Sequence, residues 1–204
     1  MIIRQEKEQD YFTVENLVRE AFWNVYRPGC SEHLVLHNFR LNKDFIKDLD
    51  LVLEDNNKII AQIMYSKANI ILDNRQKLDI ITFGPVSVLP EYQKLGYGEK
   101  IINYSINKAT KLGFGAIAIT GNPNYYNKFG FTDANNFGVY YLDLPKTEKT
   151  PFFMIKELKQ DYLKNYSGRY YDPDGYNINQ KELDEFDKQF PLKIKEKHKG
   201  NWNK

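Results

Sequence analysis

The chain has 204 residues, a hydrophobic fraction of 42% and a formal net charge of +2. This length predicts one domain with a short appendage, and the apolar content argues against global disorder. The near balance of charge gives no general case for nucleic acid or an anionic membrane surface as a partner. One cysteine excludes an intramolecular disulfide, and no stretch approaches the ~20 apolar residues of a membrane span. The N-terminus has no signal-peptide pattern, so we expect a cytoplasmic protein.

The N-terminal quarter predicts a strand followed by two helices. An apolar strand over 1–5 precedes Asp10, which we expect to cap a helix with apolar residues at i, i+3, i+4 and i+7. An Arg-Pro-Gly break ends that helix. Ser31 is expected to cap a second helix, whose apolar face would extend to Leu41.

Two turn signals divide the next stretch into three strands. The turns are polar segments at 55–58 and 73–77, and the strands before and after them are rich in Ile, Leu and Val. Short turns between consecutive strands favour antiparallel pairing, so we expect an antiparallel meander. Its last strand ends near Val88.

A glycine-rich turn at 93–98 joins that strand to the next helix. Gly96 and Gly98 allow φ above zero and a close approach of a ligand to the backbone. The turn leads into a helix N-terminus, where unpaired N–H groups favour an anion. A nucleoside-triphosphate loop would need Lys and then Ser or Thr after Gly98, and a dinucleotide loop would need a small residue where Ile101 stands. The turn therefore predicts a phosphate or pyrophosphate site of another kind.

A helix and a further strand complete a βαβ unit. The helix runs from about Glu99 to Gly113, a residue that suits the position after a helix end. The apolar strand over 116–120 should then lie parallel to the strand before the glycine turn, through a right-handed crossover. Ligands favour the carboxyl ends of such strands, which is where the glycine turn lies.

Two motifs together resemble the GNAT superfamily of N-acetyltransferases. The first is Gln-x-x-Gly-x-Gly after a strand that ends Val-x-Pro, and the second is Tyr-x-Lys-x-Gly-Phe at 126–131. Taken alone, each also fits an ordinary turn, but both stand in the order and spacing of that superfamily. The resemblance spans residues 1–158. It implies a mixed α/β (α+β) fold in which an antiparallel meander precedes a βαβ unit with splayed parallel strands.

The resemblance also implies a set of site residues and a co-substrate, acetyl-CoA. Backbone at Val86, Ser87 and Val88 would pair with the pantetheine arm, and an N–H near Val88 would polarise the thioester carbonyl. Tyr126 would protonate the departing thiolate. The pyrophosphate would lie against the main-chain N–H groups of Gln93, Lys94, Leu95, Gly96, Tyr97 and Gly98.

The general base is where the chain departs from the resemblance. Many relatives carry a Glu on the central strand, whereas 80–88 holds no acid. The segment 29–37 resembles the helical lid on the substrate side, and its candidates are Glu32, His33 and His37. Bulk water is the alternative acceptor of the amine proton.

The segment 29–37 also offers half of a metal site and a possible nucleophile. His33 and His37 stand at i and i+4, which is half a metal site, but no other ligand cluster is visible, so we expect no metal. Cys30 could act as a nucleophile, yet a lone cysteine in a Pro-Gly turn is more often incidental. Direct attack by the amine is therefore preferred.

The region 159–204 lies outside the resemblance. We expect an extension packed on the domain, with a helix capped by Asn179 and a loose lysine-rich end over 192–204. The resemblance implies an acetyl-CoA-dependent N-acetyltransferase acting on a primary amine of a small molecule or peptide. It allows a homodimer, and it does not name the acceptor. Two alternatives remain: a non-catalytic CoA-binding sensor or scaffold, and a lysine-rich end that binds an acidic partner or RNA.

Overall fold

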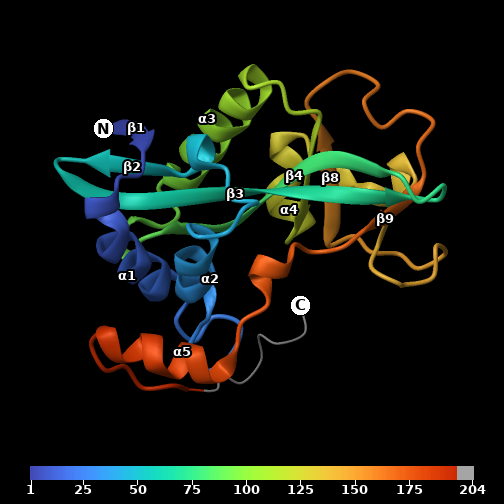
Figure 1. Ribbon diagram of the computed structural model, residues 1–204. Helices are drawn as coiled ribbons and strands as arrows, with labels where there is room; N and C mark the ends of the chain where they lie inside the picture. Colours follow the sequence, from blue (N-terminus) through green and yellow to red (C-terminus); the bar gives the residue numbers. More distant parts are fainter. Residues whose placement is uncertain (197–204) are drawn as a thin grey trace. The chain divides into compact units, whose positions relative to one another are not determined.

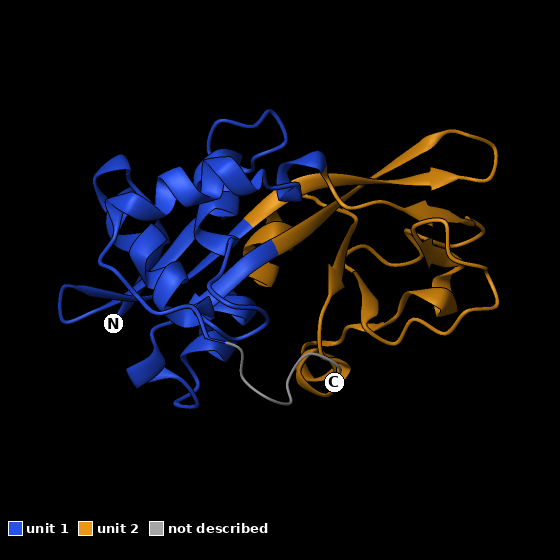
Figure 2. Cartoon of the chain, turned by 90° about the horizontal axis from the view of Figure 1, so that it is seen from below, with its two compact units in different colours: residues 1–64, 84–104, 174–204 blue, residues 65–83, 105–173 orange. Residues whose placement is uncertain are grey.

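A computed structural model of the chain describes residues 1–196 (Figure 1). Its contacts divide the chain into two compact units, which Figure 2 colours separately. The first unit comprises Met1–Met64, Gly84–Tyr104 and the described part of Asp174–Lys204. The second comprises Tyr65–Phe83 and Ser105–Pro173.

Three elements have residues in both units. They are β3 (Lys58–Leu72), β4 (Lys77–Val88) and α3 (Tyr97–Lys111). The two units are therefore built from interleaved segments. The sequence instead predicts a division at residue 158, where the resemblance to the GNAT superfamily ends. That domain boundary stays a prediction.

The first unit contains the antiparallel meander that the turn signals predict. It consists of β1 (Ile2–Gln5), β2 (Leu51–Asp55) and the start of β3. Gln5 pairs with Leu51, which in turn pairs with Ile63. The turn between β2 and β3 consists of two asparagines with positive φ, a conformation that asparagine tolerates better than most residues.

Two helices cover one apolar face of this meander. They are α1 (Tyr11–Phe22) and α2 (Glu32–Phe39), whose apolar positions recur at helical spacing. Their buried side chains form one cluster with side chains from the strands: Val14, Leu17, Val18, Val35, Leu36, Phe39, Val52, Ile59 and Met64. The amphipathic pattern in the sequence therefore locates this core correctly.

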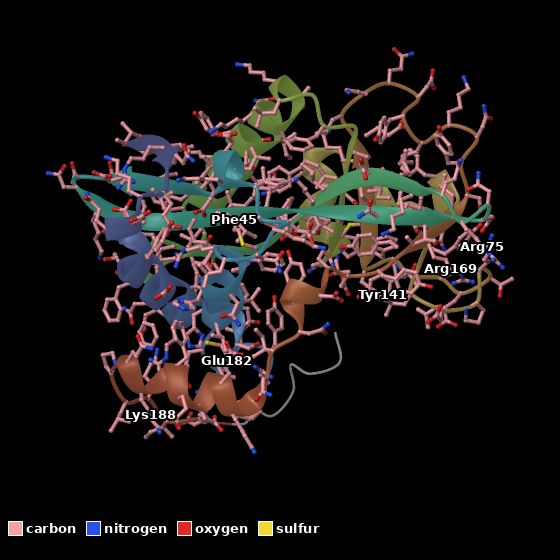
Figure 3. All side chains as sticks on the ribbon, in the orientation of Figure 1. Phe45, Arg75, Tyr141, Arg169, Glu182 and Lys188 are labelled. Carbon is pink, nitrogen blue, oxygen red and sulfur yellow. The ribbon has the colours of Figure 1, made fainter. Side chains whose placement is uncertain are left out.

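The helix α5 (Gln180–Phe186) belongs to the C-terminal extension and packs in the same unit. Asn179 caps it as predicted, because its side chain accepts from the backbone N–H of Lys181 at 2.8 Å. The carboxylate of Glu182, labelled in Figure 3, accepts from Asn38 Nδ2 at 2.9 Å. The helix α5 of the extension is thus hydrogen-bonded to α2.

The end of the extension bonds to the turn that follows α1. The carbonyl of Ile194 accepts from Trp23 Nε1 at 2.9 Å and from Asn24 Nδ2 at 3.0 Å. Lys193 forms an ion pair with Glu20 at 2.7 Å. Residues 193–196 of the segment expected to be loose are therefore bonded to the unit, Leu192 is fully exposed, and 197–204 lie outside the described residues.

The second unit contains the parallel pair that the βαβ pattern predicts. β4 pairs with β5 (Ala116–Thr120) in parallel at Thr82↔Ala118, which confirms the crossover connection. β5 pairs antiparallel with β8 (Phe153–Glu157), and β8 pairs with the short β6 (Thr132–Asp133). The fold is therefore a mixed α/β arrangement with antiparallel and parallel strands.

Two short strands in the second unit were not predicted from the sequence. They are β7 (Val139–Tyr141) and β9 (Gly168–Tyr170), which pair in parallel, and β9 also pairs with the end of β3. Arg169 donates to the carbonyls of Leu142 and Leu144 at 2.7 and 2.8 Å, and Figure 3 labels it together with Tyr141. These long-range bonds fix a loop that has no periodic sequence signal.

Three expectations near the N-terminus are wrong in detail. Asp10 stands at the start of α1, but its carboxylate accepts from the N–H of Lys7 and pairs with Arg4 instead of capping the helix. Ser31 stands at the N-cap position of α2 but makes no side-chain cap, and the Glu32 carboxylate accepts the Ser31 backbone N–H at 2.8 Å. Leu41 lies beyond α2 and is 87% exposed.

The remaining elements are short. α4 (Pro123–Tyr126) is a one-turn helix. Single turns of 3₁₀ helix lie at Glu8–Asp10, Lys47–Leu49, Pro90–Tyr92, Asn127–Phe129, Ala134–Phe137, Asp174–Tyr176 and Asp187–Gln189. Across residues 1–196, none of the helices has the length and apolar character needed to cross a bilayer.

Candidate active site

The glycine loop, residues 93–98, lies in the first unit, where it follows β4 and runs into the first turn of α3. Lys94 and Gly96 have φ of 61° and 86°, so the loop turns through two left-handed residues. The sequence predicts that this helix begins at about Glu99, whereas α3 begins at Tyr97 and Gly98 lies within its first turn. The Gln93 side chain braces the loop by donating from Nε2 to the carbonyl of Val88 at 3.1 Å.

The start of α3 presents backbone N–H groups that the helix itself cannot satisfy. The carbonyl of Gly96 accepts the first helical bond, from Lys100 N at 3.1 Å, so the N–H groups of Tyr97 and Gly98 have no intrahelical acceptor. A Cβ atom placed on Gly96 would have no described heavy atom within 4 Å. An exposed helix N-terminus favours an anion, because its N–H groups are unpaired within the helix and the positive end of the helix dipole lies there.

The last residues of β4 offer a backbone edge beyond the end of the ladder with β5. The register with β5 includes Thr82, and β4 continues to Val88. The N–H of Leu89 donates to the carbonyl of Ile60 on β3 at 2.9 Å. Since backbone groups alternate along a strand, the N–H groups of Val86 and Val88 point to the opposite edge.

The side chain of Ser87 is held by a residue that sequence reasoning missed. Gln62 donates from Nε2 to Ser87 Oγ at 2.9 Å and to the carbonyl of Pro85 at 3.1 Å, and both side chains are buried. A polar signal was present, because Gln62 interrupts an otherwise apolar strand run. These bonds fix the geometry of β4 at the residues predicted to meet the thioester.

Tyr126 lies in the second unit, where aromatic packing fixes its ring. Asn122 caps α4 by accepting from the N–H of Asn124 at 2.9 Å. The Tyr126 ring lies 6.0 Å from that of Phe83 and 6.1 Å from that of Phe131. A Cβ atom on Gly121 would lie 2.5 Å from this ring, so glycine is required there.

Tyr125 is the more exposed of the two neighbouring tyrosines. Its side chain is 37% exposed, and the ammonium group of Lys128 lies 4.5 Å from the centre of its ring. The rings of Tyr125 and Tyr126 meet edge to face at 5.0 Å. Tyr125 therefore packs against the outside of the ring predicted to act as the acid.

His33 lies in a buried cluster in the first unit. Its side chain is 0% exposed, its Nε2 lies 3.0 Å from Asp187 Oδ1, and its Nδ1 lies 3.5 Å from Cys30 Sγ. Phe186 and Phe190 lie against the ring, each with its centre 5.4 Å away. Burial lowers the pKa of His33 to about 4, although Asp187 acts in the opposite direction. A histidine that is enclosed in this way stabilises the interior, and we do not assign His33 as the general base.

The other candidates of this segment also have partners. The Glu32 carboxylate accepts the N–H of Ser31, and His37 Nδ1 lies 2.8 Å from Glu15 Oε1. Burial also raises the pKa of the Cys30 thiol well above its usual range. Within residues 1–196, no group of three or more His, Cys, Asp or Glu side chains is arranged to hold a metal ion. The structure thus brings Glu32 and His33 into the unit of the glycine loop, whereas Tyr126 belongs to the second unit.

A family model described as the acetyltransferase (GNAT) family matches residues 16–131. The chain belongs to the GNAT acetyltransferase family. It is 24% identical to the protein named "Uncharacterized N-acetyltransferase YhbS" of Escherichia coli strain K12, over 82% of this chain and 93% of that protein.

Solved structures of GNAT acetyltransferases share this fold. The crystal structure of E. coli YhbS in complex with CoA matches with a TM-score of 0.74 and 20% identity, covering 87% of this chain and 92% of that one. A GNAT acetyltransferase from Brucella melitensis in complex with acetyl-CoA matches with a TM-score of 0.68 and 22% identity, covering 86% and 97%. Both likenesses confirm the mixed α/β fold that the motifs predict.

Proposed function

We propose that this GNAT protein transfers the acetyl group of acetyl-CoA to a primary amine of a small molecule or peptide. The observation that carries this proposal is the start of α3, where a left-handed Gly96 with open space beside it precedes N–H groups that lack intrahelical acceptors. The two solved relatives named above hold CoA and acetyl-CoA, which supports the same co-substrate here.

In this proposal the chain contributes positioning, polarisation and one proton. The glycine loop holds the pyrophosphate, and the outward N–H groups of Val86 and Val88 pair with the pantetheine arm and polarise the thioester carbonyl. The amine nitrogen attacks the carbonyl carbon, and the C–S bond breaks. The departing thiolate takes the phenolic proton of Tyr126, the amine nitrogen gives its surplus proton to water, and solvent returns a proton to the phenolate.

The base in this reaction is best assigned to solvent. The segment 80–88 carries no acid, His33 is enclosed, and the Glu32 carboxylate is bonded to Ser31 N–H. A water molecule can accept the proton of an amine whose pKa is modest. No metal is needed for the polarisation, since backbone N–H groups supply it.

Tyr126→Phe tests the catalytic part of this proposal. The variant keeps the ring between Phe83 and Phe131 but removes the proton, and a positioned acid contributes about 10²–10⁴-fold. We expect kcat to fall by that factor while KM for acetyl-CoA stays nearly constant, as measured by thiol release over a panel of amines.

Tyr125→Phe is the matched control, since it removes the neighbouring hydroxyl and should leave kcat near normal. A large loss in Tyr125→Phe with full activity in Tyr126→Phe would transfer the role to the neighbour. Binding of acetyl-CoA without turnover of any amine by the wild-type chain would favour a CoA-binding sensor or scaffold.

A further inference from the structure

Two tyrosines of the C-terminal extension donate hydrogen bonds from their hydroxyl groups to backbone carbonyls of β4. In the second unit, Tyr162 donates to the carbonyl of Asp79 at 2.6 Å. In the first unit, Tyr176 donates to the carbonyl of Gly84 at 3.0 Å. Asp79 precedes the residues of β4 that pair with β5, whereas Gly84 follows them by two positions. Only the second of these bonds therefore lies toward the reactive end of the strand.

The bond from Tyr176 meets β4 beside the residues that are proposed to hold the thioester. Leu89 donates to β3, so Val86 and Val88 direct their backbone groups to the opposite edge. The N–H groups on that edge are the ones proposed to hold the thioester. The Tyr176 hydroxyl bonds to the carbonyl of Gly84, two residues before Val86.

Packing fixes the position of the Tyr176 ring. Its centre lies 4.8 Å from that of Phe39, which is 0% exposed, and the two rings meet at 62°. A Cβ atom on Gly175 would lie 2.5 Å from the Phe39 ring, so glycine is required for this approach. The turn is closed by a bond from Asn177 N to the carbonyl of Asp174 at 2.9 Å. Tyr176 as a whole residue is only partly buried.

We infer that Tyr176 determines acceptor specificity, an inference that rests on the proposed acetyl transfer. Its ring forms a wall next to the end of β4 that is proposed to receive the acyl group, and the bond to Gly84 keeps the ring from turning away. The wall admits amines carried on narrow, unbranched chains and rejects those carried on wide aromatic bodies. The face of the ring also attracts an ammonium group on the way to the thioester.

The experiment measures thiol release from acetyl-CoA with n-butylamine, benzylamine and 1-naphthylmethylamine. In the wild-type chain, kcat/KM should fall in that order. In Tyr176→Ala the ratio of naphthylmethylamine to butylamine should rise about tenfold or more, a typical scale for changes of pocket size. KM for acetyl-CoA should stay within about twofold, because the pyrophosphate loop is untouched.

Matched variants separate this role from general loosening of the extension. Tyr162→Phe removes the equivalent bond to the other end of β4, and Ile178→Ala weakens apolar packing two residues from Tyr176. Both should leave the ratio unchanged. Tyr176→Leu, which keeps an apolar contact with Phe39, takes the place of Tyr176→Ala if thermal unfolding shows that the alanine variant is not folded.

The outcomes distinguish the two proposals. An unchanged ratio in the folded Tyr176 variants, an equal rise in Tyr162→Phe or Ile178→Ala, or no turnover of the three amines by a wild-type chain that binds acetyl-CoA overturns the role of Tyr176. Lack of acetyl-CoA binding by the wild-type chain, measured by calorimetry, overturns the proposed function instead.

Discussion

The glycine loop and the His33 cluster lie in the same unit and are built in opposite ways. In the loop, backbone N–H groups lack intrahelical acceptors, and the space beside Gly96 is open. In the cluster, which comprises Arg19, Cys30, His33 and Asp187, each polar side chain has partners within the protein, and aromatic rings lie against His33. We propose a ligand for the groups of the first kind, whereas the groups of the second kind bond to other parts of the chain.

The largest effect that this comparison predicts is at Gly96. We expect Gly96→Val to reduce acetyl-CoA affinity about 100-fold or more, which is about 2.7 kcal/mol. A β-branched side chain resists the left-handed conformation and fills the space that a pyrophosphate would occupy. Isothermal titration calorimetry measures the loss directly.

Gly113 provides the control for backbone strain. Its φ of 85° matches the 86° of Gly96, a Cβ atom there would likewise meet no described heavy atom within 4 Å, and it follows the other end of α3. Gly113→Val should therefore cost similar stability and leave acetyl-CoA affinity unchanged. Normal affinity in a folded Gly96→Val protein would contradict the anion site.

The second effect concerns stability in acid and comes from His33. The unfolded chain binds a proton on this histidine below about pH 6.5, whereas the folded chain does so only near pH 4, so acidification between these values favours unfolding. From pH 7 to pH 5 the expected loss from this residue is about 2 kcal/mol. The free energy of unfolding, measured in urea at pH 7 and at pH 5, gives this loss.

His33→Gln isolates the histidine from other titrating groups. Glu6 acts in the opposite direction, because burial and the neighbouring Asp50 raise its pKa to about 9. Glu6 contributes equally to the wild-type chain and to His33→Gln, so its contribution cancels when their free energies of unfolding are subtracted. The variant should lack the loss of stability between pH 7 and pH 5 that comes from His33. Its acetyl-CoA affinity and its kcat at neutral pH should be unchanged. A collapse of kcat in a folded variant would return His33 to the list of candidate bases.

The smallest effect is expected where a side chain only braces the loop. Gln93→Leu removes the bond from Gln93 Nε2 to Val88, an exposed bond with a net value of about 1 kcal/mol. Acetyl-CoA affinity should fall about fivefold. Glu91→Gln, which removes the exposed ion pair with Lys58, is the control and should change nothing measurable. Equal affinities in the two variants would show that the loop needs no brace.

The sequence predicts the parts of this molecule that depend on local spacing. The glycine loop, the cap at Asn179 and the turn between β2 and β3 each lie within a few residues of the partners that define them. The meander and the parallel pair follow from turn signals and from the length of the crossover. The GNAT family follows from two short motifs whose order and spacing are preserved.

The parts that the sequence does not predict depend on partners far along the chain. His33 is an accessible lid residue by its sequence context, but its partner Asp187 comes 154 positions later. Tyr176 reaches Gly84 across 92 positions, and no local pattern marks either residue. Leu41 shows the converse error, because a periodic apolar residue was assigned to a helix that ends before it.

Cys30 has a practical consequence for kinetic work on this protein. It is the chain's one cysteine, it is 3% exposed, and burial holds its thiol in the unreactive protonated form. A disulfide reagent added at neutral pH therefore reports free CoA with almost no background from the enzyme. The slow labelling of Cys30 itself then becomes a clock for the opening of its surroundings, where the Lys195 side chain lies against Gly29. One reagent therefore measures two things: turnover through the fast reaction with CoA, and the local opening of residues 193–196 around Gly29 through the slower labelling of Cys30.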